Sequence, residues 1–233
     1  MSTYETYSTG VYRDAPAINQ AMARVYGYMA TATIISMLVS MFIGTNHHLV
    51  EFFFTGIMHW VVILSPLAAV FAVGYVLGND PSKSTALLCL YGFSALMGLS
   101  LGIVFAVYTM ASIASAFMGA AVLFVVMSGY GYFTKRNLDS IGKYALIALI
   151  AIIIVSLINI FIGSSMLQMV VSAIAILVFL ALTAYDTQQI REMVSVDSGH
   201  AVEVMGALTL YLDFINLFVN LLQLFGVLQS KDD

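Results

Sequence analysis

Residues 84–133 read STALLCLYGFSALMGLSLGIVFAVYTMASIASAFMGAAVLFVVMSGYGYF and contain no Asp, Glu, Lys or Arg. A helix that spans a membrane needs about 20 mostly apolar residues. This stretch is therefore long enough for two spanning helices, with a tight turn near residues 108–112. It lacks the alternating pattern and regular turns of a membrane β-barrel, so we predict helices.

The composition of the whole chain agrees with this interpretation. Of its 233 residues, 61% are hydrophobic and 9% are charged, whereas a soluble domain carries about 25% charged residues. We therefore expect an integral membrane protein. The net charge of −4 and the scattered basic residues do not suggest nucleic acid as a partner. Cys89 is the single cysteine, in an apolar run, and is read as an inert thiol.

Seven apolar segments of spanning length follow one another along the chain. Residues 25–229 are expected to form an all-α bundle of seven transmembrane helices, between an N-terminal tail (1–24) and a short C-terminal tail (230–233). A six-span form with a re-entrant last segment stays open, because polar side chains make that segment costly to insert. The predicted spans are 25–44, 53–77, 85–108, 110–133, 144–162, 166–188 and 202–228.

Lys and Arg residues gather on one side of the predicted membrane. Lys231 follows the last span, and the other seven of the eight precede the first span or lie in loops on its side. The positive-inside rule then places the N-terminus in the cytoplasm. Residues 1–24 contain no apolar core of signal-peptide length, and we expect a bacterial cytoplasmic (inner) membrane. The seven residues are Arg13, Arg24, Lys83, Lys135, Arg136, Lys143 and Arg191.

The last predicted span, GALTLYLDFINLFVNLLQLFG (206–226), carries one polar stripe. Asp213, Asn216, Asn220 and Gln223 fall on one side of a helix, and Thr209 extends that side. A helix between lipid and protein would have this pattern, and so would a central helix that lines a narrow aqueous path. An aspartate at the centre of a helix raises the free energy of membrane insertion by about 2.5–3.5 kcal/mol. We therefore expect Asp213 to have a structural or functional role that offsets this cost.

A second acid, Asp186, lies near the inner end of the sixth predicted span, with Thr183 within one turn of it. Acids inside membrane spans mark ion or proton paths, although each aspartate could instead be a structural anchor that is hydrogen-bonded to neighbouring helices. Two carboxylates about 4 Å apart repel by about 4 kcal/mol at an effective dielectric of 20. If Asp186 and Asp213 meet, they would share a proton or hold a cation. The remaining acids near the spans are expected at boundaries that water reaches: Glu51, Glu192 and Glu203.

The segments LTAYDTQQI (182–190) and GALTLYLDFINLF (206–218), with the basic loop GYFTKRNLDS (131–140), resemble the Bax inhibitor family, the transmembrane Bax inhibitor motif proteins. The resemblance extends over essentially the whole chain. It implies a seven-helix bundle with the last helix at its centre. It also implies a pH-sensitive, calcium-permeable leak path that is gated by two aspartates, which match Asp186 and Asp213.

One part of the family pattern is absent from this sequence. In the family, a basic residue of the second span can pair with the aspartate of the sixth. Here the second span holds no Lys or Arg, and its His59 lies near the outer end beside Trp60, where an interfacial anchor is expected. This puts that part of the gating scheme in doubt.

Calcium is the expected permeant ion, held weakly and in transit, with no resident cofactor. It takes six to eight oxygen ligands, and the two aspartates with water and nearby side chains could supply part of that shell. The expected partners are the lipid bilayer, calcium ions and protons. The residues expected to line the path are Thr183, Thr209, Asn216 and Asn220.

Two other functions are weighed against the leak. Some relatives in the family act on a membrane-bound, ATP-dependent quality-control protease, and the Tyr- and Ser-rich N-terminal tail could bind such a partner. An intramembrane aspartyl protease would need both acids at a water-filled centre. Asp213 has no glycine beside it in YLDFIN, so we expect no enzyme.

Overall fold

A computed structural model describes residues 14–197 and 199–229, and nine α-helices lie within them. Seven helical segments are long and apolar enough to cross a membrane, so the chain is an all-α integral membrane protein, as predicted. α9 is continuous, and the six-span alternative is wrong. The helices are α1 (Ala15–Gly44), α2 (His47–Phe54), α3 (Gly56–Leu77), α4 (Lys83–Ser100), α5 (Gly102–Val107), α6 (Met110–Phe133), α7 (Asp139–Ile162), α8 (Ser165–Val196) and α9 (His200–Gln229).

The first helix begins earlier than the sequence suggested. The Asp14 side chain accepts a hydrogen bond from the Ala17 N–H, and Pro16 occupies the first turn, which are two standard signals of a helix start. Residues 15–24, predicted as tail, are therefore helical. The rest of that tail (1–13) and the predicted C-terminal tail (230–233) lie outside the described residues.

The second predicted span corresponds to α3, and a short helix, α2, occupies most of the loop predicted before it. Asn46 caps α2 by accepting from the N–H groups of His48 and Leu49. Gly56 has a φ of 58°, a left-handed conformation that glycine adopts without strain, and the chain turns there into α3. α4 and α5 together make up the third span, 83–107.

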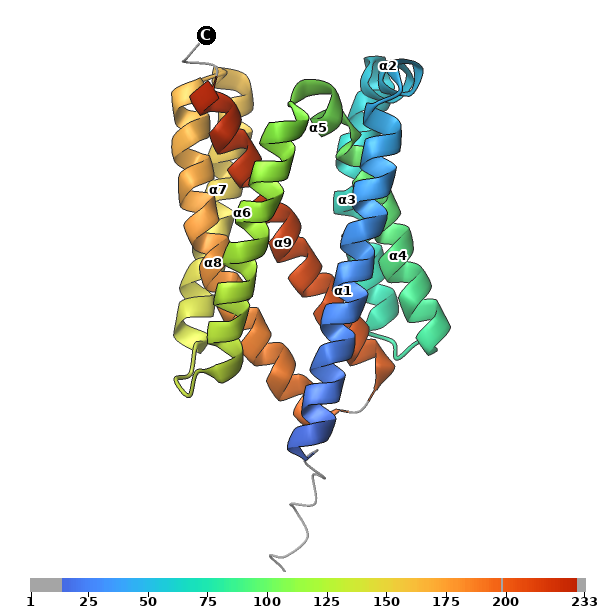
Figure 1. The fold of residues 1–233 in the computed structure, drawn as a ribbon, viewed down its shortest axis with the longest axis vertical. Coiled ribbons are helices and arrows are strands. Elements are labelled where there is room, and N and C mark those ends of the chain that lie inside the picture. The colour runs from blue at the N-terminus through green and yellow to red at the C-terminus, as the bar shows by residue number, and fades with distance from the viewer. Residues whose placement is uncertain (1–13, 198, 230–233) are drawn as a thin grey trace, which may run out of the picture.

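α9 crosses the bundle diagonally, between α6, α7 and α8 on one side and α1, α3 and α4 on the other (Figure 1). It contacts α1, α3, α4, α6 and α8. Of its most apolar stretch, 67% of the residues are buried, compared with 11% in α7. The polar stripe of α9 therefore lies among other helices, whereas α7 presents most of its surface to the outside of the bundle.

Small residues allow the spanning helices to approach closely. A Cβ atom at Gly98 of α4 would lie 2.6 Å from the carbonyl oxygen of Ser36 in α1. At Gly131 of α6, a Cβ would collide with the backbone of Ala184 in α8. Backbone contacts of this kind are typical of helix packing in membranes, and they fix the depth of α8 relative to α6.

Candidate functional site

Asp213 and Asp186 come together between α8 and α9. Asp213 is 5% exposed, and its carboxyl group faces that of Asp186 within hydrogen-bonding range. Its Oδ2 atom has no partner with hydrogen-bond geometry among the described residues. A buried polar atom without a partner is rare in folded proteins, and a carboxylate oxygen of this kind has the chemistry to take up a proton or to ligate a cation.

The two aspartates line one cavity of about 720 Å³. Its wall comes from α7, α8 and α9, and the α7 side consists of large aliphatic residues and Ser156. The polar side chains of the wall come mostly from α9, because the stripe that was read from the sequence turns toward this space. Those from α8 and α9 are Gln168, Asp186, Thr209, Asp213, Asn216, Asn220 and Gln223.

Three of the four residues expected to line a path are in this wall. Thr209, Asn216 and Asn220 line the cavity, and the two asparagines each donate an amide N–H to a carbonyl oxygen one turn earlier in α9. Thr183 does not reach it. Its hydroxyl donates to the Phe179 carbonyl oxygen at 2.7 Å, and its side chain is fully buried, so the structure places Thr183 outside the wall of this cavity.

No Lys, Arg or His belongs to the described wall of the cavity. His59 lies elsewhere, near the start of α3, with its ring against those of Phe54 and Trp60. Among the described residues, the wall of the cavity therefore offers the aspartate pair no cationic side chain, which agrees with the absence of a basic residue from the second span.

A different buried acid does have a cationic partner, which the sequence did not reveal. Glu203, expected at a boundary with water, is 1% exposed. Arg24 donates to it twice, from Nε to Oε2 at 2.8 Å and from Nη2 to Oε1 at 2.6 Å. The early start of α1 places Arg24 inside a helix that packs on α9, so the two residues meet.

Hydrogen-bonded amide groups lie at the end of the cavity away from the aspartates. Gln168 donates to Gln223 at 2.7 Å, and Ser172 donates to the same oxygen at 3.0 Å. Asn159 of α7 donates to Gln168 at 3.3 Å. The sequence placed Gln223 on the stripe, but the contributions of Ser172 and Asn159 needed the packing of three helices to be seen.

A second cavity, of about 320 Å³, lies among α1, α5, α6 and α9 and has no ionisable residue in its described wall. Its serines are already bonded: Ser36 to Ser94 and Tyr211, and Ser40 to the Leu101 carbonyl oxygen. It offers nothing to a cation. The cavity with the aspartates is thus the candidate functional site.

The chemistry of that site is limited to oxygen ligands. Among the described residues, no group of three or more His, Cys, Asp and Glu side chains is placed to hold a metal ion. A cation at the aspartates would have two carboxylates, neutral amide and hydroxyl oxygens, and water. Hard cations accept such ligands.

The chain was compared with known proteins. Residues 18–230 match the family model described as Inhibitor of apoptosis-promoting Bax1. The chain is 37% identical to Inner membrane protein YbhL of Escherichia coli (strain K12) over 226 residues, which cover 94% of this chain and 96% of the relative. It is 36% identical to the protein RP147 of Rickettsia prowazekii, covering 90% of each chain, and 36% identical to a protein of Borreliella burgdorferi, covering 92% of this chain and 94% of that one.

Proposed function

The chain belongs to the Bax inhibitor family of membrane proteins, and on this premise we propose that it is a pH-sensitive leak channel for calcium. The observation that supports the proposal is the pair Asp186 and Asp213, which meet in the wall of a polar cavity without a cationic partner.

The gate consists of these two carboxyl groups. When they share a proton, they attract each other and hold α8 against α9. When the proton is lost, two like charges at short range repel by several kcal/mol at the effective dielectric of proteins. The repulsion separates the helices or draws in a cation, and either event opens the path.

Calcium fits the oxygen atoms around this gate. Asp186 and Asp213 supply the charge, Thr209 and Asn216 line the same cavity, and water completes the six to eight ligands that calcium takes. Binding is weak, because only two of the ligands are charged. A calcium ion competes with the shared proton for the same oxygens, so its passage depends on pH.

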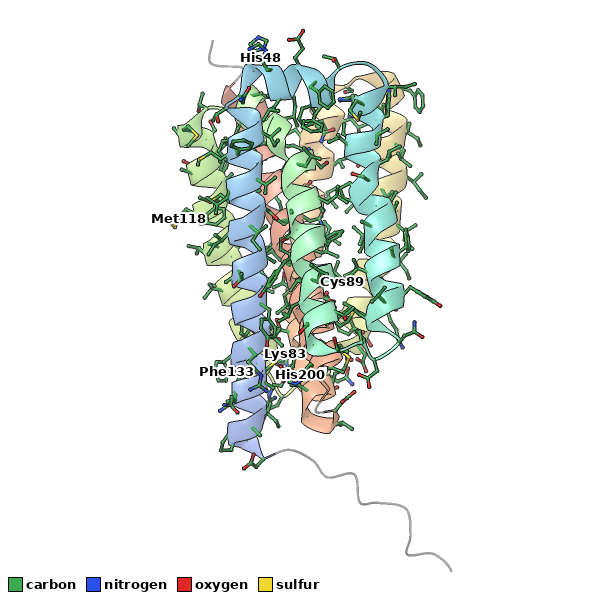
Figure 2. The ribbon with its side chains drawn as sticks, turned by 90° about the vertical axis from the view of Figure 1, so that its right-hand side faces the viewer. His48, Lys83, Cys89, Met118, Phe133 and His200 are labelled. Atoms are coloured by element: carbon green, nitrogen blue, oxygen red, sulfur yellow. The ribbon has the colours of Figure 1, made fainter. Side chains whose placement is uncertain are left out.

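The proposed setting is a bacterial inner membrane, with the N-terminus in the cytoplasm. The relative from Escherichia coli is named an inner membrane protein. Lys83 and His200 lie at one end of the bundle and His48 at the other (Figure 2). The end with Lys83 also holds Arg136 and Lys143, and the positive-inside rule orients it to the cytoplasm.

Calcium entry into liposomes tests the proposal. Liposomes that enclose a calcium dye and carry purified wild-type protein are expected to admit calcium faster than liposomes without protein. The substitutions Asp186→Asn and Asp213→Asn should each change that rate. Asp80→Asn is the matched control, since Asp80 is exposed and has a positive φ that asparagine also tolerates. Equal rates in empty vesicles and in vesicles with wild-type protein would refute the proposal.

A further inference from the structure

Two glutamines join α8 to α9 at the far end of the aspartate cavity. The Gln168 amide donates from Nε2 to Gln223 Oε1 at 2.7 Å, and the Ser172 hydroxyl donates to the same oxygen at 3.0 Å. Ser172 is fully buried, so neither hydrogen bond is an exposed surface contact. Together they hold the C-terminal part of α9 against the start of α8.

The same cluster reaches the third helix of the cavity wall. Asn159 of α7 is 6% exposed and donates from Nδ2 to Gln168 Oε1 at 3.3 Å and to the Ser164 carbonyl oxygen at 3.2 Å. Its Oδ1 accepts from the Ser164 N–H at 3.2 Å. The turn between α7 and α8 is therefore tied to the glutamines, and the cluster of Asn159, Gln168, Ser172 and Gln223 connects all three helices that form the wall.

The position of this amide cluster relative to the aspartates is informative. Gln168 and Gln223 line the same cavity as Asp186 and Asp213. Gln223 lies ten residues after Asp213, or about 15 Å along α9 by helical rise. One cavity thus has a pair of carboxyl groups near the middle of α9 and a neutral, hydrogen-bonded amide cluster near its C-terminal end.

We propose that the amide cluster is a second gate in series with the aspartates, at the outer end of the ion path. This inference rests on the proposed leak function. An ion that enters from the outer side meets the hydrogen bonds of Gln223, which must open before it reaches the aspartates. The freed amide and hydroxyl oxygens then replace part of its water shell, and because they are neutral they release it again.

A metal bridge tests whether the glutamines must separate. In the double variant Gln168→His, Gln223→His, two imidazoles occupy the places of two amides that are already within hydrogen-bonding distance. Zinc binds imidazole nitrogen at about 2.0–2.1 Å and can join them. Zinc added outside proteoliposomes should abolish most of the calcium flux of the double variant, and EDTA should restore it. Wild type and both single variants are the matched controls.

Thermal unfolding of the double variant with zinc supplies the second measurement. A rise in Tm that the single variants lack shows that the bridge has formed. If the bridge forms and the flux continues, or if it does not form in the folded protein, the second gate is refuted. If wild-type protein without zinc gives no calcium flux at all, the leak function is refuted instead. The failure of the second gate and the failure of the leak function are therefore distinguishable.

A milder substitution tests the same gate in the opposite direction. Ser172→Ala removes one of the two hydrogen bonds to Gln223 without adding volume, and it should raise the calcium flux because the outer end opens more readily. Ser156→Ala is its control, since Ser156 lines the same cavity outside the amide cluster. Identical flux in the two alanine variants would contradict the proposal.

Discussion

Two buried acids of this protein are accommodated in different ways. Glu203 receives two hydrogen bonds from the Arg24 guanidinium, the geometry that suits a carboxylate best. Asp213 faces another carboxyl group, and one of its oxygens has no hydrogen-bond partner among the described residues. An arginine paired with Asp213 in the same way would occupy its oxygens and prevent them from exchanging protons or cations. The difference therefore separates a structural ion pair from a site that can exchange protons and cations.

The ion pair leads to a prediction about stability. Removing one partner of a buried pair costs about 3–5 kcal/mol. Arg24→Gln should lower Tm more than Glu203→Gln, because Glu203 is 1% exposed while the Arg24 side chain is 32% exposed and can turn toward water. Thermal unfolding in detergent measures both, and Lys143→Gln, an exposed basic residue at the same end, is the control. The reverse order of Tm values would contradict the assignment.

At the scale of helices, the depth of Asp186 depends on how α6 meets α8. Gly131 lies against the backbone of Ala184 with no room for a Cβ, whereas Gly129, two residues earlier, has nothing within 4 Å of its would-be Cβ. Ala184 is two residues before Asp186. Any shift of α8 at this contact therefore moves Asp186 relative to Asp213.

The two glycines give a matched pair of substitutions. Gly131→Ala forces α6 away from α8 and should destabilise the protein by about 1–3 kcal/mol, the usual cost of overpacking. It should also alter the calcium flux. Gly129→Ala should leave both nearly unchanged, since its methyl group enters open space. Thermal unfolding and dye-loaded proteoliposomes measure the two effects. Equal Tm values and equal calcium fluxes in the two variants would show that the α6–α8 contact does not determine the position of Asp186 relative to Asp213.

At the scale of the whole molecule, the asymmetry of charge defines the two ends of the path. Basic side chains gather at the end that holds Lys83, and His48 lies at the opposite end (Figure 2). The amide cluster, at the turn between α7 and α8, is on the same side as His48. Calcium that enters the cytoplasm therefore passes the glutamines before the aspartates.

Cysteine labelling in whole cells tests this orientation. With Cys89 replaced by alanine, His48→Cys and Ser84→Cys each place one exposed thiol at opposite ends of the bundle. A membrane-impermeant maleimide should label His48→Cys in intact cells and Ser84→Cys only after the cells are permeabilised. The opposite pattern would reverse the proposed direction of the path.

The sequence was sufficient to predict the seven spans and the polar stripe of α9, because length, hydropathy and helical periodicity are local properties. It could not predict that Asp186 meets Asp213, since the residues lie at different distances from their helix ends and their contact depends on the tilt of α9. The same holds for Glu203, whose burial follows from the start of α1 at Ala15 and the position of Arg24. Thr183 was placed on the path because it is near Asp186 in sequence, but it faces another side of α8.

The pH profile of the calcium flux is the most direct test of the shared proton. With one shared proton the aspartate pair carries a single negative charge and is closed. Loss of that proton leaves two negative charges and opens the gate, so wild-type flux should rise as pH is raised from about 6 to about 8. The double variant Asp186→Asn, Asp213→Asn has no proton to lose at the gate and should give a flat profile. A wild-type profile that is flat, or that the double variant reproduces, would contradict gating by these two aspartates.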